Sequence, residues 1–205
     1  FVVSLDLTSG SSGDNVYSKC EGGAGNNGGF GQNQGLYNKA ELDRNGDGTI
    51  EVSNDACGDL PYVEMVKDFV GVTPNANGTY TVNYNVIVEN KGGATGTYSL
   101  SDTPQFDDDV VINSGSYSGQ ANGSMNTSGS TTLASNTSIS AGATHTYNVS
   151  LVVSLDLTSE SNGDNVYTKC EGGAGNNGGF GPNQGLYNRA QLDRNGDGTI
   201  EVSDD

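Results

Sequence analysis

The chain is 205 residues long and strongly acidic, with 25 Asp and Glu residues against 8 Lys and Arg residues and a formal net charge of −17. Nucleic acids and anionic membrane surfaces are bound by clusters of Lys and Arg, and the basic residues here are scattered singly, so the composition excludes both as ordinary partners. The apolar stretches are only a few residues long, whereas a membrane-spanning helix needs about 20, so we expect no membrane insertion in this segment. Leu, Ile, Val and Phe make up just under a fifth of the chain, and Gly contributes 32 residues. This composition fits either a disordered acidic chain or a β protein with a small hydrophobic core that needs a further source of stability.

An internal repeat sets the organisation of the chain. Residues 1–55 align without a gap on residues 151–205, an offset of 150 positions. The two copies differ at eight positions: Phe1/Leu151, Gly10/Glu160, Ser12/Asn162, Ser18/Thr168, Gln32/Pro182, Lys39/Arg189, Glu41/Gln191 and Asn54/Asp204. We therefore interpret the chain as an excerpt of a longer tandem array. In this interpretation residues 1–60 are the C-terminal part of one unit, and residues 61–205 are the next unit, nearly complete.

The first predicted feature in chain order is a disulfide. Cys20 and Cys170 are equivalent in the repeat, and the counterpart of Cys57 would lie just past the last residue of this chain. We therefore expect Cys20 to pair with Cys57, which would contribute about 3 to 4 kcal/mol by chain entropy and would imply an oxidising, extracytoplasmic compartment. A metal site at these cysteines is the competing interpretation, but neither a His nor a CxxC pair accompanies them.

Two segments have the composition of loops. Residues 21–35 are rich in Gly and Asn, and residues 113–130 are dominated by Ser, Gly, Asn and Thr. We expect both to be surface connections. The functional alternatives are a ligand-contacting tip or a site for O-linked sugar.

The most specific chemical signal is the run Asp43-Arg-Asn-Gly-Asp-Gly-Thr-Ile-Glu51, which recurs from Asp193 to Glu201. Oxygen-bearing side chains at positions 1, 3 and 5, Gly at position 6 and a backbone carbonyl at position 7 match the first half of a calcium-binding loop, and oxygen ligands without His or Cys favour Ca²⁺ over a transition metal. The predicted ligands are Asp43, Asn45, Asp47, Thr49, Glu51 and Asn54 in the first copy and Asp193, Asn195, Asp197, Thr199, Glu201 and Asp204 in the second. Because the flanks alternate like strands, we expect the loop at the tip of a β-hairpin. The competing interpretation is an acidic Asn-Gly turn that binds no metal.

Alternation of apolar and polar residues predicts the strands. In residues 79–90 every second residue from Tyr80 to Val88 is apolar, and residues 145–158 follow the same rule. Shorter strands are predicted at residues 36–42, 50–53, 63–72, 97–101, 110–112, 131–134, 166–169, 186–192 and 199–203. No segment keeps a period near 3.6. The sequence therefore predicts an all-β fold, an antiparallel β-sandwich, with one sandwich per 150-residue unit.

Candidate catalytic groups are scarce. The single His, His145, lies at the start of a predicted strand, and the chain has no GxSxG, HExxH or GxxxxGK motif. A second acidic group, Asp102 with Asp107, Asp108 and Asp109, could hold another ion, although a solvated acidic loop is the simpler interpretation. We expect this segment not to be an enzyme.

Residues near the two ends of the unit resemble a known family. Residues 66–93, which begin VKDFVGVTPNANGTYTVNYNVIVEN, look like the opening of the bacterial surface repeats called "domain of unknown function eleven", and residues 35–40 and 55–61 resemble the closing strands of those units. The resemblance implies an immunoglobulin-like sandwich, strung in tandem in secreted adhesins, envelope proteins or extracellular fibres, with no catalytic residues. The calcium hexad is similar to half of a dockerin repeat, but no helix follows it.

Together these features predict a structural unit of an extracellular, secreted or cell-surface protein. A sandwich stapled by a disulfide and stiffened by calcium would be repeated to build a bacterial stalk, adhesin or filament, with neighbouring units or identical chains as partners. The alternative is an adhesive module that recognises a glycan or a protein through its Gly-rich or Ser-rich loop. In a third possibility, the strand at residues 147–157 completes the sheet of a neighbouring chain.

Overall fold

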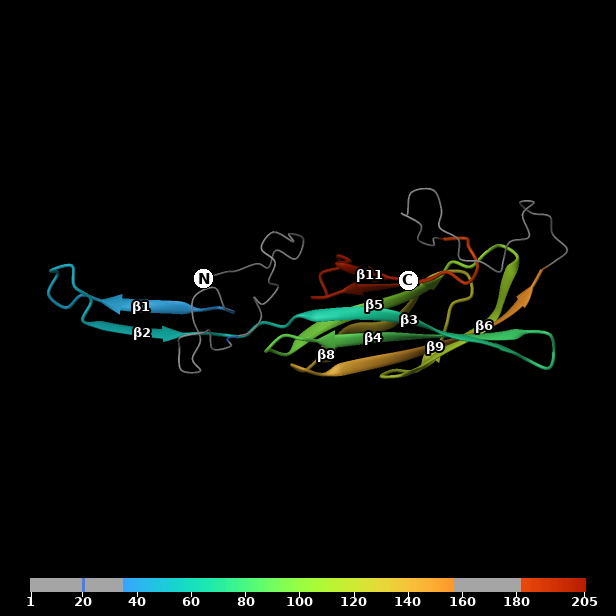
Figure 1. The fold of residues 1–205 in the computed structure, drawn as a ribbon, viewed down its shortest axis with the longest axis horizontal. Coiled ribbons are helices and arrows are strands. Elements are labelled where there is room, and N and C mark those ends of the chain that lie inside the picture. The colour runs from blue at the N-terminus through green and yellow to red at the C-terminus, as the bar shows by residue number, and fades with distance from the viewer. Residues whose placement is uncertain (1–19, 21–34, 157–181) are drawn as a thin grey trace. The chain divides into compact units, whose positions relative to one another are not determined.

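The computed structural model describes residue 20, residues 35–156 and residues 182–205, and these residues form β-strands and connections without a helix (Figure 1). Every strand pair whose register is described runs antiparallel, which confirms the predicted all-β, antiparallel class. No helix of the described part is long and apolar enough to cross a bilayer. The chain divides into two compact units: residues 1–63 with 90–96 and 138–143, and residues 64–89 with 97–137 and 144–205.

The first unit contains a two-stranded hairpin made of β1 (Asn38–Leu42) and β2 (Val52–Ala56). Ala40 lies opposite Asn54, and every residue of both strands is exposed. The acidic run from Asp43 to Glu51 connects the two strands, so it lies at the tip of a hairpin as predicted.

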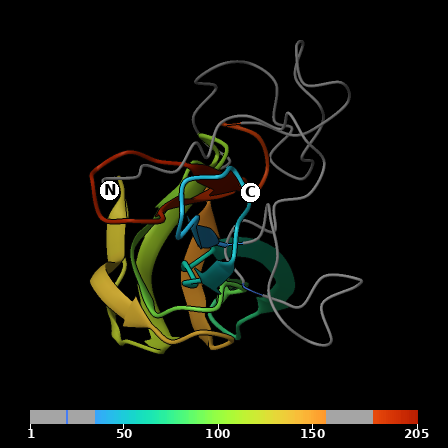
Figure 2. The same ribbon diagram turned by 90° about the vertical axis from the view of Figure 1, so that its left-hand side faces the viewer.

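The second unit is built from two larger sheets, whose strands Figure 2 views roughly end-on. The five-stranded sheet has the order β3-β4-β9-β6-β7, from β3 (Val63–Pro74), β4 (Tyr80–Asn90), β6 (Val110–Gly119), β7 (Gly123–Ser124) and β9 (Thr144–Leu155). The four-stranded sheet has the order β11-β10-β5-β8, from β5 (Gly96–Pro104), β8 (Thr131–Ile139), β10 (Asn188–Asp193) and β11 (Val202–Asp204).

The core lies between these two sheets. Buried residues alternate with more accessible ones along β4, β5 and β9, as the sequence periodicity predicts. Side chains on the inner face of β4 and β9 are almost fully buried: Val82, Tyr84, Val86, Val88, Tyr147, Val149, Leu151 and Val153. The hydroxyl of Tyr98 in β5 lies 2.6 Å from the hydroxyl of Tyr147 in β9 and 2.9 Å from Nδ1 of His145. These contacts join the inner face of one sheet to that of the other, as in a β-sandwich.

The Ser-rich segment departs from its prediction. All of residues 113–130 were expected to be a surface loop, but residues 113–119 continue β6, which pairs with β9, and β7 then pairs back onto β6. A Cβ on Gly115 would lie 2.5 Å from Cδ2 of Leu151 and 2.7 Å from Cβ of Met125, so the missing side chain is what lets these two residues pack over the strand. The expectation of a loop was wrong for residues 113–119 and 123–124, because composition does not reveal which backbone groups a neighbouring strand can pair with.

The strand expected at residues 145–158 is β9, and it lies in the middle of its sheet. It pairs with β4 on one side and with β6 on the other. A strand with partners on both sides offers no free edge, so β9 is not available to extend the sheet of a neighbouring chain. The predicted strand at residues 166–169 lies outside the described residues.

Candidate functional site

The acidic turn between β1 and β2 is organised by Asp43, the last residue before the turn. Its Oδ1 accepts the N–H groups of Asn45 at 3.1 Å and Gly46 at 2.6 Å, and its Oδ2 accepts the N–H of Gly48 at 2.7 Å. A short Asp side chain can fold back onto the following backbone in this way, and the two glycines take positive φ values of 77° and 87° that other residues rarely adopt. The sequence therefore coils the chain around one carboxylate.

Two further carboxylates complete the turn. Asp47 accepts the N–H of Thr49 on Oδ1 at 2.7 Å and the side-chain amide of Asn45 on Oδ2 at 2.9 Å. Glu51 accepts the N–H of Arg44 on Oε2 at 2.7 Å, and its own N–H donates to the carbonyl of Leu42 at 3.1 Å. The side chain of Glu51, at the end of the turn, is thus hydrogen-bonded to the backbone of Arg44, at its start.

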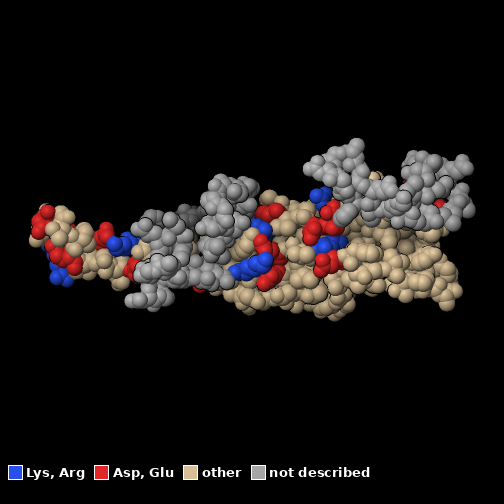
Figure 3. Space-filling view, in the orientation of Figure 1, with Lys and Arg blue, Asp and Glu red and all other residues tan. Residues whose placement is uncertain are grey.

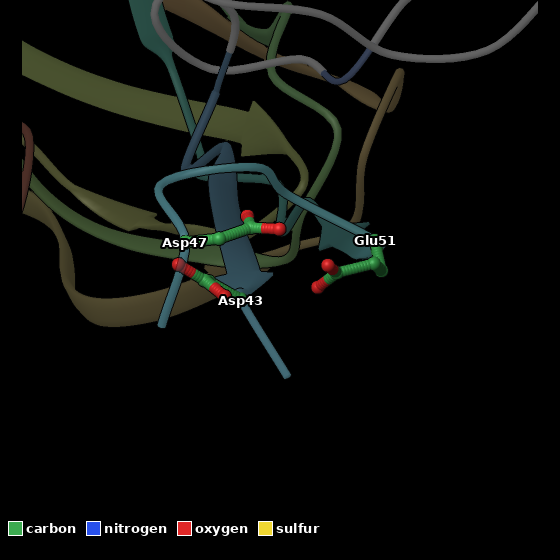
Figure 4. A group of neighbouring side chains, drawn as sticks. All are labelled: Asp43, Asp47 and Glu51. Carbon is green, nitrogen blue, oxygen red and sulfur yellow. The ribbon is translucent and has the colours of Figure 1, made fainter. Parts of the chain in front are cut away.

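The three carboxylates converge at the hairpin tip. One oxygen each from Asp43, Asp47 and Glu51 lie within 4.8 Å of one another, and Figure 4 shows the three side chains gathered beside the turn. Acidic side chains are also visible at this tip in the space-filling view of Figure 3, beside basic and uncharged ones. Such a cluster can supply the oxygen ligands that a hard divalent cation requires.

The second copy reproduces the arrangement between β10 and β11. Asp193 accepts the N–H of Gly196 on Oδ1 at 2.6 Å and the N–H of Gly198 on Oδ2 at 2.8 Å, and Glu201 accepts the N–H of Arg194 at 2.7 Å. Carboxylate oxygens of Asp193, Asp197 and Glu201 again lie within 4.8 Å of one another. Asp193 is buried, whereas Asp43 is only half-buried.

The other predicted ligands lie differently. Asn45 and Asn195 are in the turns, where the Oδ1 of each accepts a backbone N–H at 3.0 and 2.9 Å, and Thr49 and Thr199 contribute their N–H groups to the aspartates. Asn54 lies in β2 opposite Ala40, away from the tip. Asp204 lies in β11, where its Oδ2 accepts the backbone N–H of Lys67 at 2.8 Å, and it belongs to neither acidic group. The structure therefore does not bring the residues at position 12 to the other ligands.

Hydrogen bonds lower the pKa of Asp43, Asp47 and Asp197 in the turns. The pKa of Asp43 is lowered chiefly by the N–H of Gly48, with further N–H groups acting in the same direction. The N–H of Thr49 lowers the pKa of Asp47, and that of Thr199 lowers the pKa of Asp197. A carboxylate with a lowered pKa stays charged to a lower pH. Protons therefore compete less with a cation for binding to it.

Cys20 and Cys57 form the predicted disulfide, with Cα atoms 6.0 Å apart. The N–H of Cys20 donates to Oδ1 of Asp59 at 2.8 Å. Gly35 lies against the bridge with a φ of +43°, and a Cβ at this position would lie 2.8 Å from Sγ of Cys20 and 2.7 Å from the carbonyl oxygen of Gly58. The bridge therefore packs against a position that accepts no side chain.

Gly35→Ala is expected to loosen the backbone beside the disulfide. The added methyl group must displace Cys20 or Gly58, and the N–H of Leu36 donates to the carbonyl of Gly58 at 2.9 Å. We expect amide exchange at Leu36 to become about tenfold faster or more, equivalent to at least about 1.4 kcal/mol. Gly46→Ala is the control, because it also has a positive φ but has no atom within 4 Å of the added Cβ. Unchanged exchange at Leu36 would contradict the prediction.

The second acidic group is smaller than predicted. Asp107, Asp108 and Asp109 lie together, but Asp102 points elsewhere and is fully buried. Its Oδ2 contacts Nζ of Lys67, and its Oδ1 accepts the side-chain amide of Asn188 at 2.9 Å. The grouping of Asp102 with the other three was wrong because Asp102 lies on the inward face of β5.

This buried cluster was missed at the sequence level, although the periodicity contained a signal. Lys67 follows Val63 and Met65 at the same phase of β3, and Asp102 follows Tyr98 and Leu100 at the same phase of β5. Charged residues in the apolar phase of a strand indicate buried charges, which are rare unless they are paired.

Comparisons with known proteins give no further assignment. A scan with protein-family models and searches of the curated proteins and of the solved structures found no match. The family resemblance of residues 66–93 therefore rests on the sequence alone.

Proposed function

We propose that this chain is part of a structural repeat of a secreted bacterial surface stalk, adhesin or extracellular filament, rigidified by calcium and a disulfide. The observation that carries the proposal is the recurrence of one acidic turn, with the same hydrogen bonds, at the tips of two hairpins 150 positions apart. A stiffening element present once per unit suits a tandem array. The Cys20–Cys57 bridge supports an oxidising, extracellular compartment.

The strand order supports an immunoglobulin-like sandwich. The constant-type immunoglobulin fold has strands A, B, E and D in one sheet and C, F and G in the other. Taking β3, β4, β5, β6, β9, β10 and β11 as strands A to G, the order β3-β4-β9-β6 corresponds to A-B-E-D and β5-β10-β11 to C-F-G. In this assignment β7 and β8 are additions at the sheet edges.

The two hairpins support the tandem arrangement. Strands β1 and β2 occupy the same repeat positions as β10 and β11, which are the closing strands of the sandwich. Leu192 in β10 is fully buried against the sandwich, whereas its equivalent Leu42 in β1 is 52 % exposed. The exposed apolar face of β1 is what a closing hairpin would show without the rest of its unit, and we infer that residues 1–60 end a preceding unit.

Calcium is the cation that the acidic turns fit best. Asp43, Asp47 and Glu51 would hold it in the first turn and Asp193, Asp197 and Glu201 in the second, assisted by the side-chain oxygens of the two Asn residues and the carbonyls of the two Thr residues. The ion would neutralise three carboxylates that otherwise repel one another. It would thereby tie the end of each strand to the start of the next.

Calcium is expected to raise the stability of the second unit. At a calcium concentration tenfold to a hundredfold above the dissociation constant, the gain is about 1.4 to 2.7 kcal/mol, and EDTA should remove it. Asp197→Asn should abolish the calcium-dependent shift in melting temperature, because it removes one charge but keeps an acceptor for the N–H of Thr199. Asp68→Asn is the matched control, because Asp68 is exposed and belongs to none of the acidic groups. A melting temperature that is insensitive to both calcium and EDTA would remove calcium from the proposal.

The adhesive alternative has less support. Residues 113–119 and 123–124 of its Ser-rich segment belong to β6 and β7 rather than to a loop, and residues 21–34 of its Gly-rich loop lie outside the described residues. Specific binding of the chain to a glycan array would favour the adhesive function over a purely structural one.

A further inference from the structure

Three polar residues meet in the interior of the second unit. Lys67 comes from β3, Asp102 from β5 and Asn188 from β10, and their exposed fractions are 6 %, 0 % and 2 %. Oδ2 of Asp102 contacts Nζ of Lys67, and Oδ1 of Asp102 accepts Nδ2 of Asn188 at 2.9 Å. An amine and a carboxamide are therefore held against the two oxygens of one carboxyl group.

The strand register explains this meeting. Ala190 lies opposite Asp102 and Asn188 lies opposite Pro104, so Asn188 and Asp102 are diagonal neighbours on the same face of the sheet. Lys67 reaches them from the other sheet, with Nζ 5.1 Å from the centre of the Tyr84 ring. The cluster therefore bridges the first and the penultimate strands of the sandwich through its core.

The amide of Asn188 is incompletely bonded. Its Oδ1 is buried and has no hydrogen-bond partner. The nitrogen and oxygen of an amide are assigned from the hydrogen-bond network, and turning this amide over would place Oδ1 on Asp102, with Nδ2 in the position without a partner. In either orientation one polar atom of Asn188 is buried and unsatisfied, which native interiors rarely tolerate without a chemical reason.

Burial makes the charged form of Lys67 less favourable than it is in water. Burial lowers the pKa of Lys67, against the opposing effect of the Asp102 carboxylate. In a site of low dielectric, transfer of a proton from Lys67 to Asp102 removes both charges and leaves an amine beside a carboxylic acid. The amine is then a nucleophile, and the acid can donate to an amide oxygen.

We propose that Lys67 and Asn188 join spontaneously in an isopeptide bond, with Asp102 as the proton carrier. Protonated Asp102 donates to Oδ1 of Asn188 and polarises its carbonyl, Nζ of Lys67 attacks Cγ, and a tetrahedral intermediate forms. The Cγ–Nδ2 bond then breaks, and ammonia leaves. Of the three protons initially on Nζ, one stays on Asp102, one passes to the departing nitrogen and one remains on the new amide. No oxidant or second substrate is needed.

Formation of the bond would remove the unsatisfied polar atom and the buried charges of the site. Nδ2 of Asn188 departs as ammonia, and the remaining carbonyl oxygen, Oδ1, can accept from the protonated Asp102. A cavity of about 690 Å³ is lined by both Lys67 and Asn188 and offers the ammonia a way out. The bond would covalently join β3 to β10, which suits a unit that carries tension, but its formation does not depend on the proposed stalk function.

The decisive measurement is the mass of the reduced, denatured full-length chain. We expect it to be lower than the sequence mass by one ammonia, and peptide mapping should find Lys67 joined to Asn188. A mass equal to that of the sequence would overturn the proposal. It would also be overturned by ammonia loss at an Asn-Gly site such as Asn45, or by loss of water with a bond between Lys67 and Asp102.

Variants separate the chemistry from folding. Lys67→Met, Asn188→Ala and Asp102→Asn should each retain the unmodified mass, and Asp102→Asn tests the proton carrier while keeping the size of the side chain. The matched control is Asn38→Ala, because Asn38 is the repeat equivalent of Asn188 but is exposed in β1. This control should still lose one ammonia. Loss of ammonia in the Asn188→Ala chain would contradict the assignment, and the wild-type mass decides the question even if a variant fails to fold.

Discussion

Asp102→Ala is expected to lower the free energy of unfolding by about 3 to 5 kcal/mol when it is made in an Asn188→Ala chain, which cannot form the proposed bond. The substitution leaves Lys67, whose side chain is 1 % exposed, in the interior without its counter-charge. Lys67 must then be desolvated as a cation or lose its proton, and both are costly. Urea unfolding followed by circular dichroism measures the change.

A charge-free replacement serves as the control for this experiment. Lys67→Met combined with Asp102→Leu, in the same Asn188→Ala chain, removes both charges and should regain most of the lost stability. Asp68→Ala removes an exposed carboxylate and should change the stability by no more than about 0.5 kcal/mol. A loss below about 1 kcal/mol for Asp102→Ala alone would show that the pair is not buried as described.

Leu192→Ala is expected to destabilise the second unit by about 2 to 5 kcal/mol, because Leu192 is fully buried in β10 and its removal leaves a cavity. The repeat provides an internal control with the same local sequence. Leu42→Ala alters the equivalent residue in β1, which is 52 % exposed, and should cost less than about 1 kcal/mol.

The comparison of these two leucines also tests the tandem interpretation. Both variants are measured in the 205-residue chain by urea unfolding, with the loss of signal from the sandwich as the readout. Equal decreases in the free energy of unfolding would mean that β1 is packed as tightly as β10, and would contradict the exposure of the β1–β2 hairpin. In a longer chain that contains the complete preceding unit, Leu42→Ala should become as costly as Leu192→Ala.

Periodicity and repetition predicted much of this molecule. The alternation in residues 79–90 predicted β4 almost to its ends, because a strand with one face in the core must alternate regardless of its neighbours. The disulfide followed from the repeat alone, since Cys170 is the repeat equivalent of Cys20 and this leaves Cys57 as its partner within the chain. The acidic turns followed from their spacing, because an Asp-x-Asn-Gly-Asp-Gly run bonds to its own backbone.

Other features depended on residues far apart in the chain. The Ser-rich segment became β6 because β9 lay beside it and Gly115 left room for Leu151, neither of which composition records. Asp102 was misassigned to a neighbouring acidic group because closeness in sequence was taken for closeness in space.

Spacing along the chain was therefore sufficient for most of the strands, for the turns and for the bridge, since each arises from contacts within a short segment or from the repeat. The meeting of Lys67, Asp102 and Asn188 required the folded sandwich. It depends on the register between β5 and β10 and on how the two sheets pack face to face. Both are set by the packing of the whole core rather than by any local sequence pattern.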